Sequence, residues 1–229
     1  DVNAAEHERG QTALMWAVAQ RHSEVARLLI SHGADLHARS KVTYQLENTA
    51  GNTNPTGNFQ MARGGSTALL FAARNGDVAT ARVLIDAGAD VDDVAASGTS
   101  ALVIAAHSGH GAFGIYLLEQ GANANAAEAG YTALHAAVLR GQVELVEALL
   151  EHGADPDAVV EHGTPGRRFS ADYGIRYQLI GTTTFWLAAK YGEPEIVRTL
   201  AQHGADPFVV SRNRASTLQA AMGMPGSSL

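Results

Sequence analysis

Apolar and polar residues along the chain follow the spacing of short amphipathic helices. Three blocks place apolar residues at positions i, i+3 and i+4 of one helical face: Leu14, Ala17 and Val18; Leu69, Ala72 and Ala73; and Leu102, Ala105 and Ala106. A turn and a second apolar block follow, for example residues 25–30 and 145–150. The pattern predicts pairs of helices, and the alanines of each first helix predict close packing between neighbouring pairs.

Two glycine-containing markers recur along the chain at matching intervals. Gly-Ala-Asp, with one Gly-Ala-Asn variant, begins at Gly33, Gly88, Gly121, Gly153 and Gly204. A glycine two residues before Thr or Ser falls at Gly10, Gly65, Gly98, Gly130 and Gly181. Both series have spacings of 55, 33, 32 and 51 residues. A repeated unit of about 33 residues is therefore predicted, with two of the units carrying insertions.

Each unit carries signals for the ends of its helices. A hydroxyl residue stands where the N-cap of the first helix is expected: Thr12, Thr67, Ser100, Thr132 and Thr183. The second helix is predicted to end at the glycine of Gly-Ala-Asp, because a left-handed residue is needed there and glycine has no Cβ to clash. His32, His152 and His203 precede that glycine, where a cationic side chain suits the helix dipole.

The repeated unit resembles the ankyrin repeat over nearly the whole chain. Residues 130–135, Gly-Tyr-Thr-Ala-Leu-His, reproduce the family's Gly-x-Thr-Pro-Leu-His opening except for its proline. The resemblance implies an all-α solenoid of helix-turn-helix units joined by β-hairpin or loop fingers. It also implies structural roles for His22 and His110 in the turn between helices, and structural hydrogen bonding by His135.

Under this interpretation residues 1–229 form a single ankyrin-repeat domain. Five full repeats occupy residues 10–40, 64–97, 98–129, 130–160 and 181–211. The insertions lie at 41–63 and 161–180, and the partial repeats at 1–9 and 212–229. Neither end carries a convincing polar cap, so we expect a fragment or mature piece of a longer array.

Composition excludes several classes of function. The chain has 16 basic and 23 acidic residues, a net charge of −7, which argues against non-specific binding to nucleic acid or to an acidic membrane. No apolar run approaches the roughly 18 residues that span a bilayer, so we expect no membrane insertion. The absence of cysteine excludes disulfides and thiolate sites. A chain without cysteine fits either a cytoplasmic or an exported protein. Arginine-rich bacterial ankyrin arrays with comparable insertions look similar to this chain. We expect a monomer that binds no cofactor.

The resemblance implies a concave binding surface made of first helices and fingers. Its outward positions follow the Ala-Ala or Ala-Val pair of each unit and include no acidic residue: Ala19, Gln20, Arg74, Asn75, His107, Ser108, Leu139, Arg140, Lys190 and Tyr191. A cationic and aromatic stripe would recognise a partner with acidic groups, since arginine and tyrosine are enriched at binding hot spots. The alternative is that these are ordinary solvated helix positions.

The insertions lengthen fingers on the same edge of the solenoid. The Asn-, Thr- and Gly-rich residues 41–63 predict turns and mobility rather than a helix. Residues 161–180 carry arginines and aromatic residues, which could cover part of the groove or simply form a surface loop. The candidate partner-binding residues are Arg9, Gln11, Gln20, Arg74, Asn75, His107, Ser108, Tyr131, Leu139, Arg140, Arg167, Arg168, Tyr173, Lys190 and Tyr191.

Catalytic and metal sites have little support in the sequence. His107 and His110 are spaced as i and i+3 but have no obvious third ligand. Ser170, Asp172 and His162 lie in one insertion without a preorganised geometry. We therefore expect a non-enzymatic module that binds a protein or peptide through its groove and fingers. The alternative is a sensor of small anions in which residues 161–180 act as a lid.

Overall fold

The computed structural model describes residues 1–48, 58–164, 175–212 and 214–223. Its contacts divide the chain into two compact units. The first unit contains residues 1–45 and 61–123, and the second contains residues 46–60 and 124–229. Both units are built from the predicted pairs of short helices.

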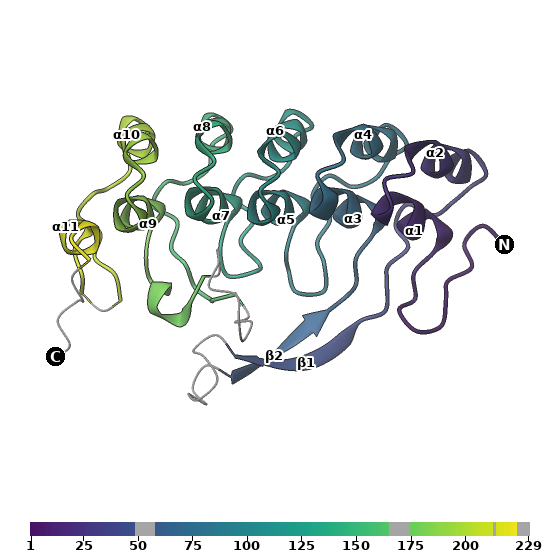
Figure 1. Ribbon diagram of the computed structural model, residues 1–229, viewed down its shortest axis with the longest axis horizontal. Coiled ribbons are helices and arrows are strands. Elements are labelled where there is room, and N and C mark those ends of the chain that lie inside the picture. The colour runs from purple at the N-terminus through teal and green to yellow at the C-terminus, as the bar shows by residue number, and fades with distance from the viewer. Residues whose placement is uncertain (49–57, 165–174, 213, 224–229) are drawn as a thin grey trace. The chain divides into compact units, whose positions relative to one another are not determined.

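Three helix pairs form the first unit. They are α1 (Ala13–Ala19) with α2 (Ser23–Ser31), α3 (Ala68–Asn75) with α4 (Val78–Asp86), and α5 (Ala101–Ser108) with α6 (Gly111–Glu119). Helix α3 contacts α1 and α5, while α4 contacts α2 and α6. The first helices α1, α3 and α5 therefore form one row, which we call the first-helix row, and α2, α4 and α6 form the second-helix row (Figure 1).

The second unit repeats this arrangement. Helix α7 (Ala133–Leu139) pairs with α8 (Val143–Glu151), and α9 (Thr184–Tyr191) pairs with α10 (Pro194–Gln202). Its first-helix row is α7, α9 and the short α11 (Thr217–Ala221), and its second-helix row is α8 and α10 (Figure 1). A 3-10 helix, η2 (Tyr177–Leu179), precedes α9.

Alanine makes the close packing of the first-helix rows possible. Ala72 and Ala73 on α3, and Ala105 and Ala106 on α5, are completely buried where the two helices meet. A larger side chain would separate helices that already fill their interior to high density. The packing predicted from the alanine pattern is thus confirmed.

The predicted helix ends are confirmed with one exception. Thr12, Ser100, Thr132 and Thr183 each accept a hydrogen bond from the backbone N–H three residues later, whereas Thr67 does not. The glycines that begin the Gly-Ala-Asp and Gly-Ala-Asn markers all have positive φ, which suits a left-handed residue at a helix end. His32, His152 and His203 place Nδ1 2.8–2.9 Å from the carbonyl oxygen four residues earlier.

The first insertion contains two strands that the sequence interpretation missed. Strands β1 (Thr43–Asn48) and β2 (Asn58–Arg63) form a two-stranded sheet (Figure 1). The composition of this insertion predicts turns alone. Three other fingers have a single antiparallel bridge each, between Ala5 and Thr12, Val94 and Ser100, and Val159 and Thr183. Of the second insertion, residues 165–174 lie outside the described part of the chain.

Candidate functional site

Arg74 is an exposed cation at the end of α3 in the first unit. Its guanidinium carbon lies 5.8 Å from the centroid of the Phe71 ring, one helical turn earlier. Among the described residues it forms no ion pair with a carboxylate. The ring supports the cation from one side without neutralising it, because a cation–π contact leaves the net charge intact. An acidic group approaching α3 would therefore meet an uncompensated positive charge.

A similar cation–π contact on the second-helix row has a different electrostatic environment. Arg82 on α4 lies 5.1 Å from the centroid of the Tyr116 ring. Burial raises the pKa of Tyr116; the charge of Arg82 lowers it, whereas Asp86 and Glu119 raise it further. Acidic residues thus accompany this cation, whereas the equivalent outward positions of the first-helix row carry none.

Asn75 and His110 join neighbouring helix pairs in the first unit. The Asn75 amide Nδ2 donates to the backbone oxygen of Ala19 at 2.9 Å, and His110 Nε2 lies 3.1 Å from the backbone oxygen of Arg74. Both side chains therefore bond to the carbonyl groups at the end of a preceding first helix. The amide of Asn75, a candidate partner-binding residue, thus contributes to the fold, and its contact with a partner stays a prediction. The structural role implied for His110 is confirmed.

In the second unit, cations and aromatic rings gather at the end of α9. Lys190 Nζ lies 5.5 Å from the Trp186 ring centroid, and Trp186 is itself held by a hydrogen bond of 3.0 Å from Nε1 to the oxygen of Ala215. Tyr191 is 48% exposed. Desolvation raises its pKa, while the charge of Arg176 acts in the opposite direction, so Arg176 is an electrostatic neighbour of Tyr191. We call Arg176, Lys190 and Tyr191 the α9 patch.

The other candidate residues occupy varied environments. Arg9 and Gln20 are exposed, and Gln11 is half-buried. His107, Ser108, Leu139 and Arg140 are also half-buried. Arg167, Arg168 and Tyr173 lie outside the described residues.

Tyr131 was expected at an outward finger position of the binding surface, but the structure places its side chain inside the repeat. The residue is buried, and loss of solvent raises the pKa of its phenol to about 12. The position beside the first glycine of a unit is therefore not always outward-facing, and the large ring of Tyr131 gains more from packing inside the repeat than from contact with water.

Trp16 is a surface residue that the sequence interpretation overlooked. It is an exposed aromatic residue on α1, at the position that Phe71 occupies on α3. Large exposed aromatic residues are enriched at protein interfaces, because they bury a large area at small conformational cost. The signal in the sequence was its place one turn before the outward position Ala19.

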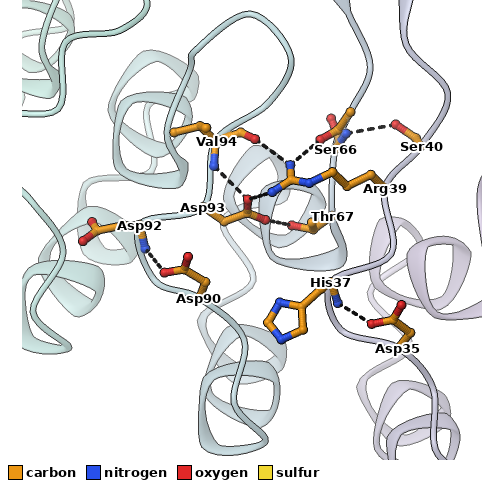
Figure 2. Close-up of polar contacts among 11 residues, drawn as sticks. Asp35, His37, Arg39, Ser40, Ser66, Thr67, Asp90, Asp92, Asp93 and Val94 are labelled. Carbon is orange, nitrogen blue, oxygen red and sulfur yellow. Dashed lines mark hydrogen bonds and ion pairs between the residues drawn. The ribbon is translucent and has the colours of Figure 1, made fainter.

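Arg39 and Asp93 form a polar network that the sequence interpretation also missed (Figure 2). Arg39 pairs with the buried carboxylate of Asp93 and donates to the backbone oxygens of Gly65 at 2.9 Å and Val94 at 2.7 Å. The Thr67 hydroxyl donates to Asp93 Oδ2 at 2.5 Å, whereas it accepts no cap hydrogen bond from α3. The network fixes the ends of the first insertion to the following finger.

His135 has the structural role implied by the repeat. Its Nδ1 accepts a hydrogen bond from the backbone N–H of Thr132 at 3.2 Å. Burial lowers the pKa of His135 to about 4, while the nearby backbone of Ala158 and Thr182 and the charge of Asp155 partly oppose this shift. The ring is therefore neutral at physiological pH. Among the described residues, no three His, Asp or Glu side chains cluster as a metal site would require.

Comparison with known proteins agrees with this architecture. The family model for ankyrin repeats in three copies matches residues 38–128 and 69–160, and the single ankyrin repeat model matches residues 9–41 and 181–212. The chain is similar to the crystal structure of the ankyrin repeat domain of Bcl-3, a unique member of the IkappaB protein family. That similarity has a TM-score of 0.69 and 25% identity, and covers 96% of this chain and 82% of that one.

A curated plant protein also shows similarity over part of the chain. The E3 ubiquitin-protein ligase KEG of Arabidopsis thaliana is 32% identical over 111 residues, which cover 41% of this chain and only 7% of the ligase. Within the described residues, no helix has the length and apolar character needed to cross a membrane. Ankyrin repeat domains generally mediate protein–protein interactions, typically as non-enzymatic scaffolds. With family models matching more than half of its length, the chain belongs to the ankyrin repeat family.

Proposed function

We propose that this protein binds an acidic protein or peptide partner through the outward ends of its first helices and through its fingers. The observation that carries the proposal is that Arg74 and Lys190 are exposed, lie over aromatic rings, and form no ion pair with a described residue. In a chain with a net charge of −7, such local positive charge favours an oppositely charged partner.

The surroundings of the two cations support the same partner chemistry in each unit. Arg74 is accompanied by the half-buried Phe71, and the exposed Trp16 occupies the equivalent position on the adjacent α1. Lys190 is accompanied by Tyr191 and Arg176 in the α9 patch. A partner segment with carboxylates beside apolar side chains could contact the cation and the neighbouring aromatic residue of one unit at once. Area and charge together give more affinity than an exposed ion pair alone, which contributes about 0–1 kcal/mol.

Selection from a random peptide library displayed on phage tests this proposal even though the partner is unidentified. We expect the selected peptides to be rich in Asp and Glu. Replacement Arg74→Ser or Lys190→Ser should weaken a subset of them by roughly tenfold at low salt, because each removes an unpaired cation. Fluorescence anisotropy of the labelled peptides measures the loss.

Matched controls separate this effect from a change in total charge. Arg82→Ser also removes an arginine over an aromatic ring, but on the second-helix row. Arg198→Ser removes an exposed cation from α10. Equal weakening by test and control variants would show that overall charge, not the first-helix row, determines binding, and the proposal would fail. Tight binding of a small carboxylate in place of any peptide would instead favour the alternative of an anion sensor.

A further inference from the structure

Strand β1 and Val42, the residue just before it, carry exposed apolar side chains. Val42 is 42% exposed and Tyr44 66% exposed, although both are large apolar residues. Because side chains alternate between the faces of a strand, these two residues lie on the same face, and Thr43 points to the opposite one. We call Val42 and Tyr44 the hairpin face.

The backbone of β1 also has an open edge. The sheet contains only β1 and β2 among the described residues, so one side of β1 faces no other strand (Figure 1). Proteins usually protect such edges with proline, lysine or a bulge, since unpaired N–H and C=O groups can pair with another chain. Residues 43–46, Thr-Tyr-Gln-Leu, contain neither proline nor lysine.

The base of the hairpin is firmly attached to the repeats of the first unit. Ser40 N–H donates to the oxygen of Ser66 at 3.0 Å, and Gly65 N–H donates to the oxygen of Ser40 at 3.1 Å. The Arg39 network adds bonds from the same segment to Gly65 and to the next finger (Figure 2). A strand that is already fixed at its base loses less conformational entropy when a partner binds.

Exposed cations lie next to this base. Lys41 immediately precedes Val42, and its N–H donates to the oxygen of Arg9 at 2.7 Å, so the backbones of Lys41 and Arg9 are adjacent. Both side chains are exposed. A partner segment along β1 would therefore meet apolar side chains on one face and positive charge at the start of the strand.

We propose that β1 binds an extended segment of a partner protein by strand addition, with apolar side chains of that segment against the hairpin face and carboxylates beside Lys41 and Arg9. This mode uses backbone hydrogen bonds for affinity and alternate side chains for specificity. The inference rests on the proposed function only in treating the chain as a protein-binding module, because it uses different residues.

The phage-selected peptides also test this inference. We expect one class in which apolar residues alternate and Asp or Glu lies at one end. The double replacement Val42→Ser/Tyr44→Ser should weaken this class by roughly tenfold. N-methylation of alternate backbone amides in the peptide should abolish its binding, because it removes the donors that strand addition requires.

The control Val25→Ser/Leu28→Ser removes similarly exposed apolar residues (48% and 59%) from α2 and should leave affinity within about twofold. Circular dichroism and thermal unfolding verify that both double variants remain folded. If every selected peptide binds Val42→Ser/Tyr44→Ser as well as it binds the wild type, or if N-methylated peptides bind equally well, strand addition is overturned. Self-association that the same replacement abolishes would identify a second copy as the occupant, and would also overturn it. Selected peptides whose affinity falls only when Arg74 or Lys190 is replaced would leave the proposed function intact.

Discussion

The carboxylate of Asp93 accepts a hydrogen bond of 2.5 Å from the hydroxyl of Thr67, the residue at the N-cap position of α3. Arg39 completes the arrangement by pairing with the same carboxylate from the preceding finger. Asp93 is 7% exposed and Arg39 48%. Forming this pair therefore removes less water from the charges than forming a fully buried pair would. The buried carboxylate of Asp93 depends more on Arg39 than the half-exposed Arg39 depends on Asp93.

We predict strong coupling between these two residues. Arg39→Ala should destabilise the protein by about 1–2 kcal/mol, because it leaves a buried carboxylate with fewer donors. Asp93→Ala should cost a similar amount, while the double replacement should cost less than the sum, since each single replacement already breaks the Arg39–Asp93 pair. Urea unfolding of the four proteins of this double-mutant cycle measures the coupling. Additive losses in the free energy of unfolding would show that Arg39 and Asp93 do not stabilise each other.

The pKa of His135 predicts a specific loss of stability in acid. The folded-state pKa is about 4, below the ordinary value of 6.5, so the unfolded chain binds more protons between these pH values. Stability from this residue is fully present above pH 6.5 and decreases as the pH falls toward 4, by roughly 3 kcal/mol in total.

A glutamine found elsewhere in the chain suggests the variant that isolates this contribution. Gln219 makes the same reciprocal cap with Ser216 that His135 makes with Thr132, so His135→Gln should preserve the cap without the titration. Urea unfolding between about pH 4.5 and 7 should show a shallower pH dependence for His135→Gln than for the wild type. Identical slopes would mean that His135 does not titrate as its burial requires.

Gly76 combines a left-handed backbone with a close side chain. Its φ is +67°, and a Cβ atom there would lie 2.6 Å from the ring of His110. Gly192 ends α9 in the same conformation, but a Cβ would meet nothing within 4 Å. We predict that Gly192→Ala costs about 1 kcal/mol from backbone strain, and that Gly76→Ala costs distinctly more.

Thermal unfolding of both glycine variants checks this difference. Adding His110→Ala to Gly76→Ala should remove the extra destabilisation, because the ring that the new Cβ would meet is then absent. Equal losses for Gly76→Ala and Gly192→Ala would show that the ring of His110 moves aside freely, despite its contact with the Arg74 carbonyl.

Local patterns were sufficient to predict the repeats, the helix pairs and most helix ends. Differences between repeats were harder to interpret. Thr67 looks like the other N-caps, and the signal for its different role is Asp93, which stands where the neighbouring units have Ala38, Ala126 and Ala158. Strand β1 likewise had a signal in the alternation of Val42, Tyr44 and Leu46 with polar residues, but the turn-forming composition that follows obscured it.

The binding surface was less predictable, because the position of a residue in the repeat indicates which way its side chain points but not what that side chain contacts. Arg74 and Lys190 do occupy exposed ends of first helices, whereas Tyr131 is buried and Asn75 bonds to a neighbouring helix. Side-chain size and the neighbouring repeat decide these outcomes, and neither is visible in the pattern of one unit. The expected bacterial origin and monomeric state remain predictions.

Mapping a bound peptide by amide chemical shifts tests the central claim most directly, and a chain of 23.9 kDa suits this measurement. On titration with an acidic peptide from the selection, we predict the largest shifts at the ends of α3 and α9, around Arg74, Lys190 and Tyr191, or along β1 for the strand-adding class. Shifts confined to the second-helix rows, α2, α4 and α6 or α8 and α10, would contradict the account.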